Sequence, residues 1–238
     1  MKLLIDAGNT RIKWAFVKGD EWLRSGALPV EQVSELAQHL NDISHVQQIW
    51  VSNVAGENVA QAIRALTSHP INFITARVAQ CGVRNNYTDV TQLGSDRWAA
   101  LIAAWHLIGS ACLVVNCGTA MTVDSLSNQG EFMGGLILPG TNMMQQSLVS
   151  GTAQLKSYSG EYATFPLSTA DAIFSGTIQA SCGAIQRQHD LLKNDAAPIL
   201  LSGGASGMLQ AHLNNLPIRM SDNLVLQGLG LIAREMNA

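Results

Sequence analysis

Two copies of one strand–turn–strand pattern, 110 positions apart, constrain the fold more than any other feature of this 238-residue chain. The first copy is Leu-Leu-Ile-Asp-Ala-Gly-Asn-Thr at residues 3–10, and the second is Leu-Val-Val-Asn-Cys-Gly-Thr-Ala at residues 113–120. In both, an apolar strand ends near a polar side chain and reverses at a glycine, which tolerates the positive φ angles of hairpin turns. A repeat of this length predicts two lobes that share one fold.

The elements around each copy follow the same order. We expect three antiparallel strands, then helix, strand, helix, strand (βββαβαβ) in a lobe over residues 1–110, and a similar lobe over residues 111–238. The predicted fold class is α/β, with the duplicated lobes facing each other across a central cleft where ligands bind at the strand ends.

Individual residues of the first lobe predict where helices and loops begin. Pro29 is expected to open a helix, and the polar, turn-rich residues 81–93 are expected to form a ligand-contacting loop. Ser95 is the expected N-cap of a helix over residues 98–107.

Composition limits the possible partners. Charged residues make up 13% of the chain and hydrophobic residues 47%, which favours an oligomer with part of its exterior covered. A net charge of −3 without a Lys/Arg cluster gives no electrostatic footprint for nucleic acid. No apolar run approaches the ~18 residues of a membrane helix and no signal peptide is evident, so we expect a cytoplasmic protein without membrane contact.

The two glycine turns are suited to binding phosphate. Glycine allows close backbone approach, and backbone N–H groups together with the hydroxyls of Thr10 and Thr119 can donate to anionic oxygens. Lys13 can add positive charge, and the carboxylate of Asp6 can face a metal ion. A single hairpin of this kind is often only a turn, but two matched hairpins favour a phosphate-binding function.

Asp96 and Arg97 form a charged pair at the start of an otherwise apolar helix. The pair could simply interact with the helix dipole. The functional alternative is that Asp96 takes the proton from an attacking hydroxyl while Arg97 holds an anionic group of the substrate.

Five motifs, in order and spacing, resemble those of the type III pantothenate kinases. They are Asp6-x-Gly8-Asn9-Thr10, Gly94-x-Asp96-Arg97, Gly118-Thr119-Ala120-x-Thr122, Gly134-Gly135-x-Ile137-x-Pro139-Gly140 and Thr169-x-x-Ala172-Ile173-x-x-Gly176. The resemblance covers nearly the whole chain. It implies ribonuclease H-like lobes of the acetate and sugar kinase, Hsc70 and actin superfamily. It also implies ATP-dependent phosphorylation of pantothenate to 4′-phosphopantothenate, the first step of coenzyme A biosynthesis.

The resemblance also implies residue roles. The residues expected to bind ATP are Asp6, Ala7, Gly8, Asn9, Thr10, Arg11, Ile12, Lys13 and Thr119. Those expected to bind pantothenate are Tyr87, Gly94, Ser95, Asp96, Arg97 and Thr169. Asp96 would be the general base, Asp6 would orient Mg²⁺ through water, and Thr169 would be contributed across a homodimer interface.

The second turn departs from the family pattern in one respect. Many members carry Asp at the position of Asn116, where it binds an activating monovalent cation; Asn116 would offer K⁺ or NH₄⁺ only an amide oxygen. Two other functions stay open. One is phosphorylation of a different small molecule on the same fold, and the other is a non-enzymatic accessory role in transcription, as described for some relatives.

Overall fold

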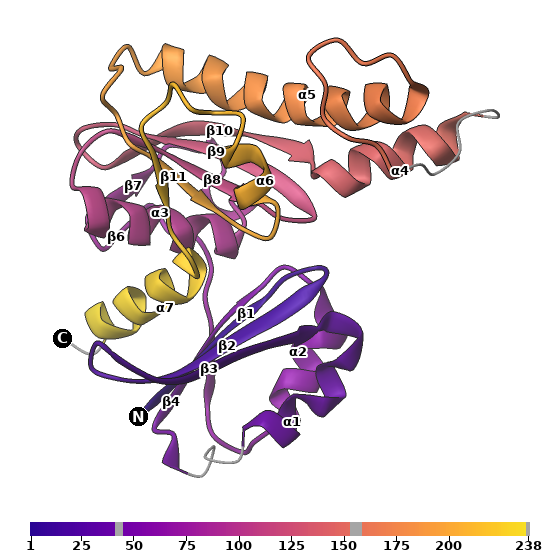
Figure 1. The fold of residues 1–238 in the computed structure, drawn as a ribbon. Helices are drawn as coiled ribbons and strands as arrows, with labels where there is room; N and C mark the ends of the chain where they lie inside the picture. The colour runs from indigo at the N-terminus through magenta and orange to yellow at the C-terminus, as the bar shows by residue number, and fades with distance from the viewer. Residues whose placement is uncertain (41–44, 153–158, 237–238) are drawn as a thin grey trace. The chain divides into compact units, whose positions relative to one another are not determined.

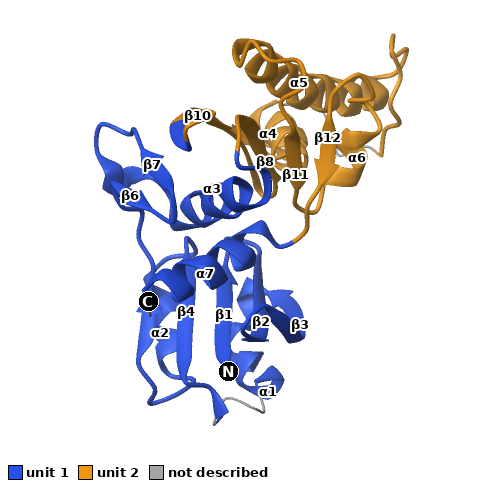
Figure 2. Cartoon of the chain, turned by 90° about the vertical axis from the view of Figure 1, so that its left-hand side faces the viewer, with its two compact units in different colours: residues 1–109, 130–132, 223–238 blue, residues 110–129, 133–222 orange. Residues whose placement is uncertain are grey.

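The structure, a computed structural model, describes residues 1–40, 45–152 and 159–236 and divides into two compact units (Figures 1 and 2). Unit 1 comprises residues 1–109, 130–132 and 223–238, and unit 2 comprises residues 110–129 and 133–222. No helix within these described ranges combines the length and the apolarity that a membrane span requires.

Unit 1 is built on a five-stranded sheet in the order β3-β2-β1-β4-β5. Its strands are β1 (Lys2–Ala7), β2 (Arg11–Lys18), β3 (Glu21–Pro29), β4 (Gln48–Asn53) and β5 (Ile71–Phe73). β1 lies in the middle, antiparallel to β2 and parallel to β4. Because helices cover both faces, consecutive residues of β1 are buried: Leu3 and Ile5 join the core with α1 and α2, whereas Leu4 faces α7.

The helices of unit 1 are η1 (Val30–Glu35), α1 (Leu36–His39), α2 (Glu57–Arg64), η3 (Val90–Gln92), α3 (Ser95–Ile108) and α7 (Leu224–Glu235). The helix predicted after Pro29 is a 3₁₀ segment followed by one α-helical turn, because Gln32 has non-helical dihedral angles. The loop predicted over residues 81–93 contains β7 (Val83–Asn85), which pairs with β6 (Ala79–Gln80).

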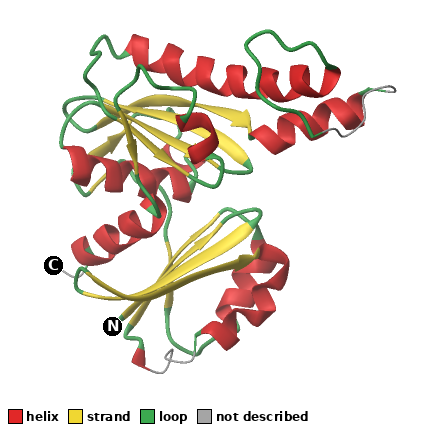
Figure 3. Ribbon diagram, in the orientation of Figure 1, coloured by secondary structure: helices red, strands yellow, loops and turns green. Residues whose placement is uncertain are grey.

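Unit 2 repeats the topology of unit 1 with the order β10-β9-β8-β11-β12. Its strands are β8 (Cys112–Cys117), β9 (Ala120–Leu126), β10 (Glu131–Pro139), β11 (Ile199–Ser202) and β12 (Ile218–Met220), and its helices are α4 (Thr141–Gly151), α5 (Thr169–Leu191) and α6 (Ser206–Gln210). β8 is antiparallel to β9 and parallel to β11, as β1 is to β2 and β4. The matching strand orders confirm the predicted duplication, and Figure 3 shows the same mixture of helices and strands in both units.

The C-terminal helix differs from the predicted division at residue 110. α7 follows the last strand of unit 2 but belongs to unit 1, where it packs on α3 and on β1. The packing of α7 on α3 depends on Gly228, since a Cβ there would lie 1.9 Å from the carbonyl oxygen of Ala99. The first two residues of β10 also belong to unit 1, because they pair with β7.

Candidate active site

Asp6 lies near the C-terminal end of β1, the strand at the centre of the unit 1 sheet. In the register of the sheet it lies opposite Lys13 on β2 and Ser52 on β4. Ser52 is fully buried, and its hydroxyl lies 2.9 Å from that of Ser95, the first residue of α3. This serine pair joins the end of β4, next to Asp6 in the sheet, to the start of α3, which carries Asp96.

Ser95 therefore does not act as the predicted N-cap. The cap position is occupied by Gly94, and Ser95 is already inside the helix with its side chain directed to Ser52. A Cβ at Gly94 would lie 2.7 Å from Oδ1 of Asp96, so a larger residue would displace the carboxylate. That same oxygen accepts a hydrogen bond of 2.8 Å from the backbone N–H of Arg97.

The negative charge of Asp96 affects the carboxylate of Asp6. Burial, with the negative charge of Asp96 as a second cause, raises the pKa of Asp6 to about 7, although Lys13 opposes the shift. Burial also raises the pKa of Asp96, while the backbone N–H and the charge of Arg97 offset part of the effect. Two carboxylates with raised pKa values in one place are typical of acid–base or metal-assisted chemistry.

Arg97 is buried beside two aromatic rings. Its Nη1 donates a 3.0 Å hydrogen bond to the hydroxyl of Tyr87, and its guanidinium carbon lies 5.7 Å from the ring centroids of both Tyr87 and Phe132. The two rings pack on each other with centroids 5.2 Å apart. A buried cation held in this way is ready to bind an anionic group.

The first turn places its polar residues at the surface. Asn9, Thr10 and Arg11 are exposed, and the backbone N–H of Gly8 donates to the carbonyl oxygen of Arg11 at 3.1 Å. Ala7 and Ile12 are fully buried in the core, so only their backbone groups can serve a ligand.

The second turn lies in unit 2. Thr119 is exposed between β8 and β9, and Asn116 lies on β8 opposite Thr122 on β9 and Ser202 on β11. The last predicted site residue, Thr169, is the exposed first residue of α5. The predicted residues thus form one group in unit 1, around Asp6 and Asp96, and a second group in unit 2.

Known proteins match nearly the whole chain. A family profile described as type III pantothenate kinase matches residues 2–190. Curated proteins named type III pantothenate kinase from Nitrosospira multiformis and Aromatoleum aromaticum are each 46% identical. Those alignments cover 98% and 99% of this chain and 91% and 98% of the two relatives. The chain belongs to the type III pantothenate kinase family.

Solved structures show the fold alone. A Campylobacter jejuni protein named for the Baf family of transcriptional activators is 22% identical, with a TM-score of 0.65 and coverage of 99% of this chain and 98% of that one. An activator of 2-hydroxyisocaproyl-CoA dehydratase from Clostridium difficile, solved with bound ADPNP, is 14% identical, with a TM-score of 0.52 and coverage of 99% and 94%. This member of the pantothenate kinase family therefore has the fold of the actin-like ATPases and sugar kinases.

A divalent metal ion fits the unit 1 site. Carboxylate oxygens are the ligands that Mg²⁺ prefers, and a cation beside Asp6 would offset the electrostatic penalty that raises its pKa. Within the described residues no group of three or more His, Cys, Asp or Glu side chains could hold a metal by itself. This agrees with the usual binding of Mg²⁺ by one or two carboxylates together with substrate phosphates.

The sequence of this pantothenate kinase family member did not predict two residues of the unit 1 site. Ser52 carries no functional signal in the sequence, apart from the serine at position 202 that stands at the corresponding end of β11. Phe132 gave no signal at all, because it lies in an apolar strand 35 positions after Arg97 in the sequence.

Proposed function

We propose that this chain phosphorylates pantothenate with ATP to give 4′-phosphopantothenate, the first step of coenzyme A biosynthesis, in the cytoplasm. The observation that carries the proposal is the Ser52–Ser95 contact in a chain of this family, because Ser52 lies opposite Asp6 in the sheet and Ser95 precedes Asp96 in the helix. Asp6, the acid proposed to face the metal, lies near the end of strand β1, and Asp96, the proposed base, lies at the start of helix α3. Both are therefore on rigid elements.

In the proposed reaction Asp96 is the general base. Its carboxylate accepts the proton of the pantothenate hydroxyl while the hydroxyl oxygen forms a bond to the γ-phosphorus of ATP. The bond between that phosphorus and the β–γ bridging oxygen breaks, and ADP leaves. The raised pKa of Asp96 makes the carboxylate a stronger base than an exposed aspartate, and Gly94 leaves space for it.

Arg97 and Tyr87 are the proposed binding groups for the pantothenate carboxylate. The guanidinium supplies the charge, and Tyr87 and Phe132 hold it in place. Gly94 and Ser95 fix the position of the helix start, and Thr169 is the further proposed contact from α5.

The proposed ATP site uses both turns. The residues from Asp6 to Lys13 supply backbone N–H groups, the Thr10 hydroxyl and the Lys13 ammonium to the phosphates, and Thr119 supplies a second hydroxyl. Asp6 would hold Mg²⁺ through water, and the ion would supply positive charge to the phosphates. For a monovalent cation, K⁺ or NH₄⁺, the Asn116 side chain would supply a neutral amide oxygen in place of a carboxylate.

A homodimer is part of the proposal, with Thr169 completing the partner's pantothenate site. Exposed apolar side chains are frequent in unit 2 on β10, α4 and the segment before α5, and Ile137, Phe165 and Leu167 are 65%, 85% and 99% exposed. Such side chains favour a covered surface. Light scattering coupled to size exclusion tests this: Ile137→Glu should shift the protein toward the monomer mass, whereas His69→Glu on exposed unit 1 surface should not.

The deciding experiment is a phosphorylation assay. Purified protein with ATP, Mg²⁺ and pantothenate should release ADP and form a product with the mass of phosphopantothenate. A panel of sugars and hydroxy acids should give far less ADP. Formation of no phosphopantothenate in buffers containing Na⁺, K⁺ or NH₄⁺ would overturn the proposal, and turnover of another alcohol would point to a different kinase on the same fold.

A further inference from the structure

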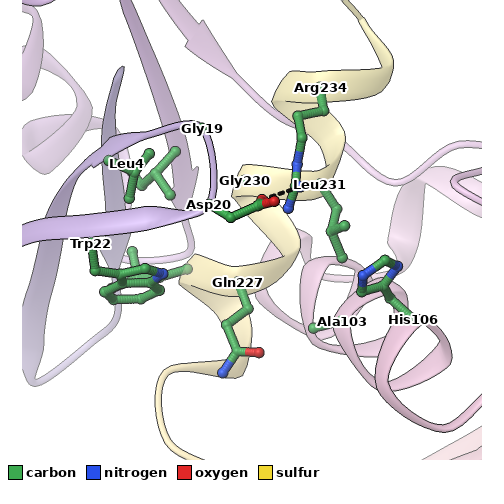
Figure 4. A pocket seen from close by; sticks show the side chains of 12 residues that line it. Leu4, Gly19, Asp20, Trp22, Ala103, His106, Gln227, Gly230, Leu231 and Arg234 are labelled. Carbon is green, nitrogen blue, oxygen red and sulfur yellow. Dashed lines mark ion pairs between the residues drawn. The ribbon is translucent and has the colours of Figure 1, made fainter. Parts of the chain in front are cut away.

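A cavity of about 210 Å³ lies in unit 1 between the β2–β3 turn and α7 (Figure 4). It opens at the start of β1, near Leu4 and Val17, whereas Asp6 lies toward the other end of that strand. No residue that we assign to the phosphorylation reaction lines it. We propose that this cavity is a binding site for a small amphipathic carboxylate.

The inner part of the cavity is apolar. Leu4, Val17 and Leu226 line it and are almost fully buried, and Trp22 contributes an indole ring that is 39% exposed. In Figure 4 the Trp22 ring lies on one side and the His106 imidazole on the other. A ligand ring or branched chain placed against Trp22 would cover the part of the indole that now faces water, which favours binding.

The outer part of the cavity carries an ion pair. Asp20, in the β2–β3 turn, pairs with Arg234 on α7. The two side chains are 78% and 46% exposed, and exposed pairs of this kind contribute little to stability. A ligand carboxylate can therefore replace the carboxylate of Asp20 on the guanidinium at little expense, and a guanidinium binds carboxylates in a bidentate manner.

A second cation adds to the positive charge at this corner. Lys2 donates a 3.0 Å hydrogen bond to the carbonyl oxygen of Ala233, the neighbour of Arg234. Burial and the charge of Arg234 lower the pKa of Lys2, so the two cations repel each other. A second anion would relieve this repulsion, which favours a carboxylate ligand over a neutral one.

Gly230 keeps the cavity open. A Cβ at this position would meet only Cδ1 of Leu4, at an ordinary contact distance of 3.6 Å, so close packing does not require glycine here. Glycine inside a helix is less favourable than alanine. By contrast, Gly228 on the same helix is required, because its Cβ would clash with the backbone of Ala99. The unforced glycine at position 230 is consistent with a space that serves a ligand.

The size of the cavity limits the ligand. Drug-sized ligands occupy roughly 300–1,000 Å³, so this cavity suits a single ring or a short branched chain with one carboxylate. Phenylacetate is a suitable probe, and phenylacetamide is its neutral counterpart. For a ligand of this size we expect a dissociation constant on the order of 1 mM.

The test is an NMR titration of the full chain without ATP or pantothenate, so it does not depend on the proposed function. The indole N–H signal of Trp22, assigned with Trp22→Phe, should shift saturably with phenylacetate and much less with phenylacetamide. Arg234→Gln should weaken binding about tenfold or more, and Asp20→Asn should strengthen it about threefold. The control is Arg64→Gln, which breaks an exposed 2.7 Å ion pair with Glu57 elsewhere in unit 1 and should leave binding unchanged.

A second variant tests the cavity itself. Gly230→Leu should fill the space and remove the saturable shift, whereas Gly183→Leu, at a helical glycine of α5 with no atom near its Cβ position, should not. The proposal is overturned if phenylacetamide binds as tightly as phenylacetate, if Arg234→Gln binds normally, or if Gly230→Leu retains the full shift.

Discussion

The turn after β1 and the turn after β8 are built on the same backbone scaffold but carry different chemistry. In unit 1 the N–H of Val30 donates to Thr10 and that of Val54 to Ala7, at 3.0 Å each. In unit 2 the N–H of Gly140 donates to Thr119 at 2.9 Å, and that of Ala205 donates to Cys117 at 3.2 Å. Each turn is thus held by one bond from the end of the third strand and one from the segment after the fourth.

The side chains around the two turns differ in charge. Asp6 stands beside Lys13 and Asp96, whereas the corresponding Asn116 is neutral and lies opposite Thr122 and Ser202. The comparison teaches that the duplicated hydrogen bonds preserve the geometry of the turn, while the carboxylates and their raised pKa values are found in unit 1.

In unit 2, two glycines allow the neighbouring segments to approach the backbone of the second turn closely. A Cβ at Gly140 would lie 2.2 Å from the carbonyl oxygen of Gly118, and a Cβ at Gly203 would lie 2.5 Å from that of Cys117. Near the first turn, Val30 stands at the position that corresponds to Gly140, and Asn53 stands at the position that corresponds to Gly203. The second turn is therefore more tightly enclosed by its own backbone.

The largest effect expected is that of Asp96→Asn, which removes the base on the unit 1 side. Turnover of pantothenate should fall about 10²–10⁴-fold, with fold and nucleotide affinity nearly unchanged, because the proton acceptor is lost and the volume is kept. Steady-state kinetics and nucleotide titration measure both quantities. Asp195→Asn, at an exposed aspartate, serves as the control. Retention of more than about a tenth of the rate would contradict the general-base role.

Asp6→Asn converts the first turn to the composition of the second. Activity should fall about 10–100-fold, since the group that orients the metal-bound water loses its charge. Kinetics over a range of Mg²⁺ concentrations would show whether the loss lies in metal use. Unchanged Mg²⁺ dependence and rate would show that the charge difference between the two turns has no catalytic meaning.

The same substitution should stabilise the protein at high pH. The folded pKa of Asp6, about 7, exceeds the unfolded value of about 3.9, so ionisation of Asp6 lowers wild-type stability as the pH rises from about 4 to about 7. The neutral amide of the variant has no such penalty, and we expect a gain of roughly 1–3 kcal/mol at pH 8 that shrinks toward pH 5. Thermal unfolding without nucleotide or Mg²⁺ measures it, with the exposed Asp195→Asn as control. A gain independent of pH would rule out this cause.

Gly203→Ala tests the enclosure of the second turn. Because Gly203 has a φ of +100° and its Cβ would contact the backbone of Cys117, alanine should displace the turn and raise the KM for ATP about tenfold. It should also lower stability by roughly 1–3 kcal/mol. The neighbouring Gly204→Ala, with no atom near its Cβ position, should leave both unchanged. A lower melting temperature with an unchanged KM for ATP would show that this packing stabilises the fold but does not contribute to ATP binding.

Asn116→Asp is the smallest change and gives the second turn the acid of the first. Under the cation hypothesis, K⁺ or NH₄⁺ should raise turnover of the variant about two- to fivefold more than that of the wild type, since a carboxylate binds cations better than an amide. Rates in KCl, NH₄Cl and choline chloride at equal ionic strength measure the response. An identical response in both proteins would show that no cation acts at this position.

The sequence supported a large share of this picture. Its repeat predicted the duplicated strand order, and the Gly-Ser-Asp-Arg segment pointed to Asp96 and Arg97 as a pair at the start of a helix. It did not reveal that Ser95 turns away from the helix end to contact Ser52, because a capping serine and a buried serine look alike in one dimension. Nor did it reveal Phe132, whose place beside Arg97 depends on β10 pairing with β7.

Sequence alone determined the periodic patterns: which strands are buried, where the glycine turns fall, and that the architecture is repeated. These are local properties, since burial period and backbone freedom are encoded by neighbouring residues. Tertiary structure alone decided that α7 packs in unit 1, that two acids with raised pKa values meet near the end of β1, and that Gly230 leaves a cavity. Those features depend on contacts between segments that are distant in the sequence. The burial and the charge around a residue therefore cannot be predicted from its own segment alone.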